Sequence, residues 1–368
     1  MSRSSGSLWK LAFQKFNKDF WGVSSLCVIL FYAICAIFAY VLAPDDTQFA
    51  NQMHISIHSQ SPGFTVDMIE LPYSGDNQSR FWDWYTGTKT TQEEIPFSEL
   101  KKENGNILYR PYNVDGKEMP FIEINHKVAS GIELSRFRES FTSTKTFLLG
   151  TDKYGRDLLS RMLVGTRISI SIGFVTVLIS LLIGVLLGAI AGFYGGKIDA
   201  AIMWIINVTW SIPTLLMVIA ISIALGKGFF TVFIAVGLTM WVEVARVVRG
   251  QVITAKEFQY VTAARALGYN NWRIITRHIL PNIMAPVIVI SAANFAASIL
   301  IESGLSFLGL GAQPPMPSWG GMIKDHYQYI ILDKAYLALV PGFAIMTLVM
   351  AFMLLGNSLR DALDVKTT

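Results

Sequence analysis

Long runs of apolar residues, separated by shorter polar stretches, dominate the sequence. A run of about 20 such residues is long enough to cross a lipid bilayer as a helix. Six runs approach or exceed that length: 22–43, 168–191, 200–225, a run that is uncharged over 228–242 and continues past Glu243, 283–301 and 335–357. The pattern therefore predicts an all-α membrane protein with six transmembrane helices.

Composition supports the membrane interpretation. Hydrophobic residues make up 52% of the 368 residues and charged residues only 15%, against roughly 25% charged in an ordinary soluble domain. Mean hydropathy is +0.44. These values exclude a disordered chain, a basic nucleic-acid-binding protein and a secreted disulfide scaffold.

The placement of lysine and arginine predicts the orientation of the spans. If six spans alternate, the first 20 residues, the 244–282 segment and the C-terminal tail lie on one side, and all three are rich in basic residues. Cytoplasmic loops carry such an excess, so both termini are predicted to be cytoplasmic. The 22–43 run exceeds the apolar core of a signal peptide, about 7 to 15 residues, and we expect it to be an uncleaved anchor.

Two features inside the spans bear on packing. Gly184, Gly188 and Gly192 recur every four residues in the second span, and small residues at that spacing let helix backbones approach closely in lipid. Pro213 interrupts the third span, where a proline kinks a helix. The sequence leaves open whether this kink is a moving hinge or static.

The 44–146 stretch, placed outside the membrane by the alternation of spans, predicts a small and mostly β insert. Asp115-Gly116 is a hairpin signal between two short extended runs. His54 and His58 lie in a segment that alternates like a strand, which would put them on one face. No third ligand is evident, so no metal site is predicted.

The 244–282 segment predicts two short helices around a glycine corner. Phe258, Val261, Ala264 and Leu267 repeat every three residues and suggest one apolar helical face. Gly268 follows, and Asn270 is a plausible cap for a second helix running to about His278, with Pro281 ending it. Periodicity alone leaves open whether the apolar edge meets lipid or a protein partner.

The 302–334 segment is rich in glycine and proline among aromatic and apolar residues. It reads as too broken for a helix and too apolar for a free linker. Irregular backbone at membrane depth is tolerated only when it is buried in protein or lines a water-filled cavity. A lid folded into the outer mouth and a surface ledge are both compatible with this pattern.

The sequence lacks the motifs of nucleotide hydrolysis and of other common catalytic sites. Gly196-Lys197 comes closest to a P-loop, but isoleucine follows at Ile198. HExxH, G-x-S-x-G and CxxC are all absent. Only Glu243 and Glu302 approach the membrane, so a proton relay is not indicated. The chain is therefore predicted to form a translocation pathway and not to be an enzyme.

Residues 262–268, followed by 278–282, resemble the EAA loop of ABC-importer permeases, which reads E-A-A-x3-G-x9-I-x-L-P. Ala263, Ala264, Gly268, Leu280 and Pro281 match at the right spacing. The chain departs from the pattern at two positions, with Thr262 in place of the glutamate and His278 in place of the isoleucine.

Further stretches resemble dipeptide and oligopeptide permeases of the C type: 149–161, 192–199, 305–320 and 359–364. The resemblance covers about 1–43 and 147–368. The 44–146 insert is longer than the usual outer loop of the family. Similarly long first loops occur in permeases resembling the microcin C and oligopeptide type.

The resemblance implies a type I ABC importer permease in the bacterial inner membrane. Its implied partners are a second permease chain, two cytoplasmic ABC ATPases and an extracytoplasmic peptide-binding protein, with no nucleic acid. ATP and Mg would be used by the ATPases, and this chain would hold no cofactor or metal. The implied cargo is dipeptides or oligopeptides.

The resemblance also assigns roles along the chain. Residues 1–43 would be the cytoplasmic N-terminus and first span, 44–146 the insert, and 147–368 the permease core, with the coupling loop at 246–282 and the lid at 302–334. The ATPase-coupling residues would be Thr262, Ala263, Ala264, Arg265, Gly268, Leu280 and Pro281. The residues of the translocation path or lid would be Glu302, Phe307, Gly309, Gly311, Pro314 and Trp319.

Three alternatives stay open from the sequence. A sister importer of the same family would carry nickel, an antibiotic peptide or a glycan. A channel or receptor would use the insert to sense ligand and would need no ATPase. A membrane-bound enzyme would hold its active site in the insert, where no nucleophile, metal or paired-carboxylate motif is present.

Overall fold

The structure is a computed structural model, and it describes residues 8–72, 81–89, 92–114, 116–124, 129, 131–226 and 228–363. The chain forms two compact units. The first comprises Met1–Ala33, Ser169–Gln313 and Gly342–Thr368, and the second comprises Ile34–Ile168 and Pro314–Pro341. Asp364, the last residue of the C-terminal motif, lies outside the described residues.

Among the described residues, five helical segments are long and apolar enough to cross a membrane, and a bent pair makes a sixth. The five segments contain α2 (Phe20–Ile37), α6 (Leu158–Tyr194), α9 (Phe229–Ala255), α12 (Met284–Phe307) and α14 (Tyr336–Leu363). The predicted helical membrane architecture is confirmed, and the fourth span continues past Glu243 as expected.

The bent pair is the predicted third span. It consists of α7 (Gly196–Trp210) and α8 (Thr214–Leu225), which meet at 89°. Pro213 precedes α8 as its N-cap. Because proline lacks an N–H and its ring clashes with the preceding turn, the helix breaks completely here and continues in a new direction.

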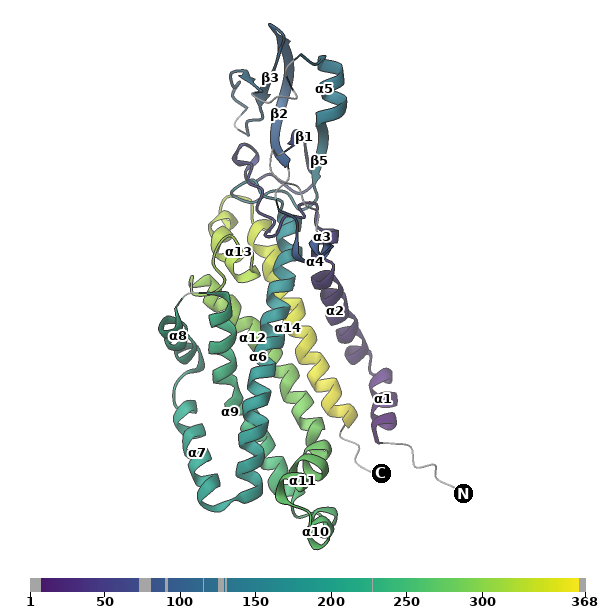
Figure 1. The fold of residues 1–368 in the computed structure, drawn as a ribbon, viewed down its shortest axis with the longest axis vertical. Helices are drawn as coiled ribbons and strands as arrows, with labels where there is room; N and C mark the ends of the chain where they lie inside the picture. The colour runs from purple at the N-terminus through teal and green to yellow at the C-terminus, as the bar shows by residue number, and fades with distance from the viewer. Residues whose placement is uncertain are drawn as a thin grey trace, which may run out of the picture. The chain divides into compact units, whose positions relative to one another are not determined.

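In the first unit, α9 lies against α6, α7, α8 and α12 (Figure 1). Among its many buried residues, one row is spaced four apart: Val232, Val236, Met240, Val244, Val248 and Val252. Such a row turns slowly around a helix because 3.6 residues make a turn. The first half of the row packs with α8 and α12, and the second half packs with the 261–283 segment and α6.

Shorter helical elements complete the first unit. α1 (Leu8–Lys18) precedes α2. Between α9 and α12 lie α10 (Gln259–Ala266), α11 (Asn271–Arg273), a π-helical turn (Ile274–Ile279) and a 3-10 turn (Leu280–Ile283).

The insert lies in the second unit and is built on a five-stranded antiparallel sheet with strand order β4–β3–β2–β1–β5. The strands are β1 (Phe64–Pro72), β2 (Gln92–Glu103), β3 (Asn106–Pro111), β4 (Ile122–Glu123) and β5 (Thr142–Phe147). α5 (Leu134–Phe141) covers the sheet, with Phe137 fully buried among Ile69, Leu100 and Ile107. The predicted small, mostly β insert is confirmed.

Further short helical elements belong to the second unit. α3 (Ala39–Leu42) follows α2, and α4 (Asp83–Thr86) packs beside it. α13 (Trp319–His326) and a 3-10 turn (Tyr327–Ile330) lie within the segment read as too broken for a helix. That prediction is wrong in both halves of the segment, because α12 also continues to Phe307.

Asp115 of the predicted hairpin turn lies outside the described residues. The tight turn that the structure shows joins β2 to β3 at Asn104-Gly105, where both residues have positive φ, 52° and 84°. Asn-Gly is the preferred dipeptide for such turns.

The expected strand around His54 and His58 is wrong. Ile55–Ile57 forms a 3-10 turn, and the His54 ring pairs with Glu94 of β2 at 3.3 Å. The tertiary partner therefore sets the conformation of this segment. Among the described residues, no group of three or more potential metal ligands is present.

Candidate functional site

The 259–283 segment contains the corner that the sequence predicted. α10 ends at Ala266, and Gly268 adopts φ +74°. The N–H of Gly268 donates to the Arg265 carbonyl at 2.9 Å, and the N–H of Tyr269 donates to the Ala264 carbonyl at 3.2 Å. This pair of bonds is a Schellman motif, in which the left-handed residue is ordinarily glycine. Gly268 thus satisfies the last carbonyls of α10 and turns the chain.

The second helix begins as predicted but does not end where predicted. The Asn270 side chain accepts a hydrogen bond from the Arg273 N–H at 2.8 Å and caps α11. Pro281, expected to end the helix, instead stands in the first turn of the 3-10 segment that leads into α12. A proline fits there because the N–H that it lacks would have no intrahelical partner.

The coupling residues implied by the resemblance divide into a buried and an exposed set. Ala264 is buried beside Val261, and both join a core that contains Phe193, Val248 and Ile275. Leu280 is partly buried against the same core. The exposed residues of the set are Thr262, Ala263, Arg265, Gly268 and Pro281. The corner therefore rests on the bundle and presents one side outward.

The outward side of the corner is apolar and basic. Its large exposed side chains are Phe258, Tyr260, Leu267 and Trp272, and Arg265, Arg273 and Arg277 are exposed among them. The single apolar face predicted through Phe258 and Leu267 is wrong, since only Val261 and Ala264 are buried. Tyr269, which sequence reasoning missed, stacks on the His278 ring at 5.6 Å and lies 4.2 Å from the Arg273 guanidinium.

Gly184, Gly188 and Gly192 line a seam between α6 and α9. A Cβ at Gly184 would lie 2.7 Å from the Trp241 carbonyl oxygen. The corresponding oxygens are those of Ala245 for Gly188, at 2.5 Å, and Arg249 for Gly192, at 2.7 Å. Real Cβ contacts are not this short, so each glycine admits the backbone of α9.

Two arginines of α9 hold α7 in place. Arg249 forms a bidentate ion pair with Asp199, with N···O distances of 2.5 and 2.6 Å. Arg246 donates to Asn207 at 3.0 Å, and its guanidinium lies 3.5 Å from the centre of the Trp210 ring. A planar guanidinium suits both contacts. The basic residues counted toward orientation thus also fix the broken span.

The first half of the predicted lid closes the end of α12. Glu302 is buried, and its Oε1 accepts a hydrogen bond from the Ser306 hydroxyl at 2.6 Å. Gly309, with φ +81°, ends the helix through a second Schellman motif, and Gly311 packs against Ser306 so closely that a Cβ would meet its backbone at 2.6 Å. Phe307 is exposed.

The second half of the predicted lid belongs to the second unit. Trp319 is fully buried, and its Nε1 donates to the Met162 carbonyl of α6 at 3.1 Å. Gly165 leaves room for the ring, because a Cβ there would lie 2.9 Å from Trp319 Cδ1. Pro314 is exposed and forms a cis peptide bond with Pro315. Trp319 is therefore a packing residue within this unit.

His326 is a buried histidine that sequence reasoning missed. Its Nδ1 lies 2.8 Å from the Met322 carbonyl, and its Nε2 accepts from the Lys153 N–H at 3.4 Å. Burial lowers the pKa of His326 below its ordinary 6.5, and Lys153 acts in the same direction, against the charges of Asp152 and Asp325 and the bond to Met322. The folded state therefore favours the neutral ring.

This environment predicts a pH dependence. Because the folded-state pKa is lowered, the stabilisation is complete above about pH 6.5 and is lost as the pH falls through the folded-state pKa, by at most about 1.4 kcal/mol per pH unit. Protonation at Nε2 would turn this nitrogen into a donor that faces the Lys153 N–H, so the hydrogen bond between them would be lost. Thermal unfolding of the purified protein at about pH 7 and about pH 5.5 should show this loss, and the His326→Gln variant should show less of it. An equal slope in both proteins would contradict the assignment.

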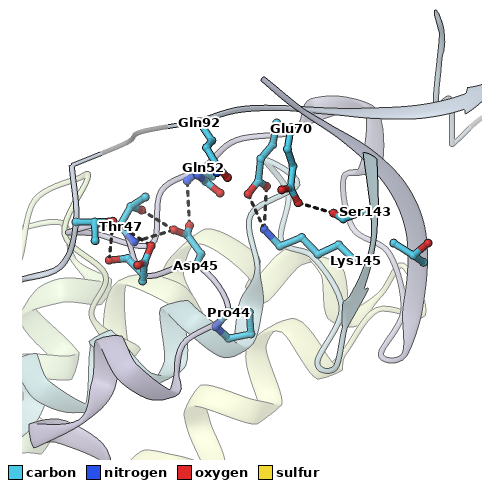
Figure 2. A pocket seen from close by; sticks show the side chains of 12 residues that line it. Pro44, Asp45, Thr47, Gln52, Glu70, Gln92, Ser143 and Lys145 are labelled. Carbon is cyan, nitrogen blue, oxygen red and sulfur yellow. Dashed lines mark hydrogen bonds and ion pairs between the residues drawn. The ribbon is translucent and has the colours of Figure 1, made fainter. Parts of the chain in front are cut away.

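A polar pocket of about 340 Å³ lies in the second unit at the base of the sheet (Figure 2). Asp45 accepts from the Thr47 hydroxyl at 2.6 Å and from the Gln52 N–H at 3.2 Å. Glu94 accepts from Lys145 at 2.8 Å. Burial acts to raise the pKa of Glu94, but the His54 hydrogen bond and the Lys145 charge outweigh it and lower that pKa. These bonds satisfy Asp45 within the 45–52 loop and pair Glu94 of β2 with Lys145 of β5, so internal partners account for both carboxylates.

Two family models match the chain. Residues 184–368, about half of the chain, match the model of the binding-protein-dependent transport system inner membrane component. Residues 7–62 match the model of the N-terminal transmembrane domain of oligopeptide transport permease C. Both agree with the resemblance drawn from the EAA-like loop and the C-type motifs.

Several proteins named as transport permeases are similar to the chain. A glutathione transport system permease protein of Pectobacterium atrosepticum is 43% identical over 218 residues, which are 59% of this chain and 72% of that protein. A dipeptide transport system permease protein of Bacillus subtilis is 43% identical over 59% of this chain and 68% of that protein. An oligopeptide transport system permease protein of Escherichia coli is 41% identical over 59% and 72%. The solved MetNI methionine ABC transporter aligns with a TM-score of 0.45 and 16% identity over 55% of this chain and 96% of that chain.

Proposed function

Because the chain belongs to the binding-protein-dependent inner membrane components of ABC importers, in the dipeptide and oligopeptide permease family, we propose that it forms half of the translocation pathway of an ATP-driven peptide importer. A second permease chain would supply the other half. Two ABC ATPases would hydrolyse ATP with Mg on the cytoplasmic side, where both termini would also lie, and an extracytoplasmic protein would deliver the peptide.

The observation that carries this proposal is the corner at Gly268. It is a rigid turn, held by a Schellman motif and the Asn270 cap, that joins the bundle core on one side and presents apolar and basic side chains on the other. An exposed surface of this kind fits a groove on a partner protein better than open water. The match of this segment to the EAA pattern makes an ATPase the proposed partner.

Coupling would use differential binding to two states. If closure of the ATPases pushes the corner, the force reaches α9 and α12 directly, since Val261 and Ala264 share a core with Val248 of α9 and Val287 of α12. A ligand shifts a conformational equilibrium only by its difference in affinity for the two states. A rigid corner passes the movement of the ATPases on to the helices, whereas a flexible loop would deform instead.

The cargo proposal rests on the relatives. Their names give glutathione, dipeptides and oligopeptides, all of which are peptides or peptide-like. We therefore assign short peptides as the cargo class, with the length preference set in part by the binding protein.

The test is purification of the tagged chain in mild detergent, followed by reconstitution into liposomes. We expect a second permease chain and P-loop ATPases to co-purify, and uptake of a labelled tripeptide to need ATP and the binding protein. ATP-driven uptake of nickel or a glycan, with no peptide uptake, would keep the importer and overturn the cargo. Peptide flux without any bound ATPase would overturn the importer in favour of a channel.

A further inference from the structure

The insert carries a group of exposed aromatic side chains to which the proposed transport function assigns no role. Phe81, Trp82, Trp84 and Tyr85, here called the aromatic patch, lie on α4 and the turn before it. Phe81 is 84% exposed and Trp82 60% exposed, and the other two are at least 40% exposed. Four large aromatic side chains left uncovered by the rest of the chain at one place indicate an interaction surface.

The C-terminal end of α4, next to the aromatic patch, is tied to the 46–48 segment. Gly87, with φ +79°, ends α4 directly beside Gln48 and Tyr40. A Cβ at this position would lie 2.6 Å from Gln48 Cα and 2.8 Å from the Tyr40 ring. The Thr88 N–H donates to the Asp46 carbonyl at 2.9 Å, and the Gln48 N–H donates to the Thr88 carbonyl at 3.1 Å. The exposure of the patch is therefore built into the fold.

The place where it is held is the insert end of the first span. The Trp84 ring lies 6.2 Å from Phe38, between α2 and α3, and α4 packs beside α3 (Figure 1). α2 has 18 residues, which rise about 27 Å, close to the bilayer hydrocarbon core of about 30 Å. A chain that enters at the start of α2 thus reaches the opposite interface near Phe38.

Large apolar side chains are also exposed at the end of α2 and along α3, next to the patch. Ile34, Ile37, Phe38, Val41 and Leu42 are each at least 44% exposed. In a membrane permease, side chains so exposed along a span face lipid unless a partner covers them. The patch extends this surface at the depth where tryptophan and tyrosine are enriched, because their rings are apolar and their N–H and O–H groups are polar.

A cationic side chain contacts the aromatic patch. Arg167 donates to the Tyr85 carbonyl, and its guanidinium lies 3.8 Å from the centre of the Tyr85 ring and 5.3 Å from that of Tyr40. Arginine has five N–H donors, so donors remain for a lipid phosphate beside the aromatic rings. Rings together with a fixed cation match the glycerol and headgroup layer of a bilayer.

We propose that the aromatic patch anchors the insert in the lipid interface of the leaflet on the insert side. The sheet would then be attached to the bilayer through α4 as well as through the spans that flank it. This inference depends on the chain spanning a membrane, and it is independent of the cargo and of the coupling corner.

The test places a fluorescent probe in the patch of the full-length chain. Cys27 and Cys35, the free cysteines of the described chain, are replaced by Cys27→Ser and Cys35→Ala, and an NBD label is attached through Trp82→Cys. The matched control is Ile122→Cys, at a 44% exposed position on β4. Both proteins are reconstituted into phosphatidylcholine and phosphatidylglycerol liposomes, with and without headgroup spin-labelled lipid.

We expect emission from position 82 to shift to shorter wavelength, to be quenched by spin-labelled lipid and to be shielded from aqueous iodide. Position 122 should show the reverse. Quenching at position 82 like that at position 122 would overturn the proposal, and so would shielding that needs the partner permease and shows no lipid quenching. Phe81→Cys, at the most exposed position of the patch, repeats the test if Trp82→Cys lowers the yield.

Discussion

Replacing Gly268 by aspartate is expected to abolish ATP-driven peptide import while the chain still reaches the membrane. Gly268 has φ +74°, and no atom lies within 4 Å of where its Cβ would be. The only cost to the fold is therefore that of placing a residue with a Cβ in the left-handed region, about 1–2 kcal/mol. The total free energy of unfolding of a protein is about 5–15 kcal/mol.

The proposed contact with the ATPase is far less tolerant of this change. An unpartnered charge enclosed at a contact costs about 3–5 kcal/mol, which weakens binding by more than about 100-fold. The measurement is ATPase co-purification together with ATP-driven uptake, both per unit of membrane-inserted chain.

Two variants separate the charge from the backbone effect. Gly268→Asn keeps the size of the side chain without its charge, and asparagine tolerates the left-handed region, so we expect it to retain part of the activity. Gly105→Asp introduces the same change in the β2–β3 turn, where φ is +84° and no atom lies within 4 Å of a Cβ. It should import almost normally. Normal import by Gly268→Asp would remove the corner from the coupling mechanism.

The periodicity of the corner shows where sequence reasoning stops. A spacing of three residues turns 300° on a helix of 3.6 residues per turn, so the face drifts by about 60° at each step. From Phe258 to Leu267 the drift is about half a turn, and the structure accordingly buries only Val261 and Ala264. The glycine corner and the Asn270 cap, by contrast, depend on local backbone chemistry and were predictable.

Long-range partners account for most of what the sequence could not supply. The apolar runs predicted the spans because span length is set by the bilayer. The conformation at His54 depends on Glu94, 40 positions away, and the role of Arg249 depends on Asp199. The β2–β3 turn is different, since its Asn104-Gly105 signal is local and could have been found from the sequence.

The glycines of the second span combine both kinds of information. Their four-residue spacing predicted a close helix contact, but it could not identify the helix that approaches. The structure shows that helix to be α9, with the carbonyls of Trp241, Ala245 and Arg249 at the three positions. Since α9 also contacts α7, α8 and α12, a change at the seam should disturb most of the first unit.

Gly188→Leu is therefore expected to prevent stable assembly of the chain, and Gly188→Ala to destabilise it. The alanine methyl would lie 2.5 Å from the Ala245 carbonyl oxygen and 3.0 Å from Ala245 Cα. These are backbone atoms, so α9 itself must move, at a cost of about 1–3 kcal/mol for the methyl and more for leucine.

The control is Gly250→Ala in α9, where no atom lies within 4 Å of a Cβ. Alanine is favoured over glycine in a helix by up to about 1 kcal/mol, so this variant should be stabilised. Thermal unfolding in detergent would then show opposite signs for two identical substitutions, and a Gly188→Ala protein as stable as the wild type would contradict the close contact between α6 and α9.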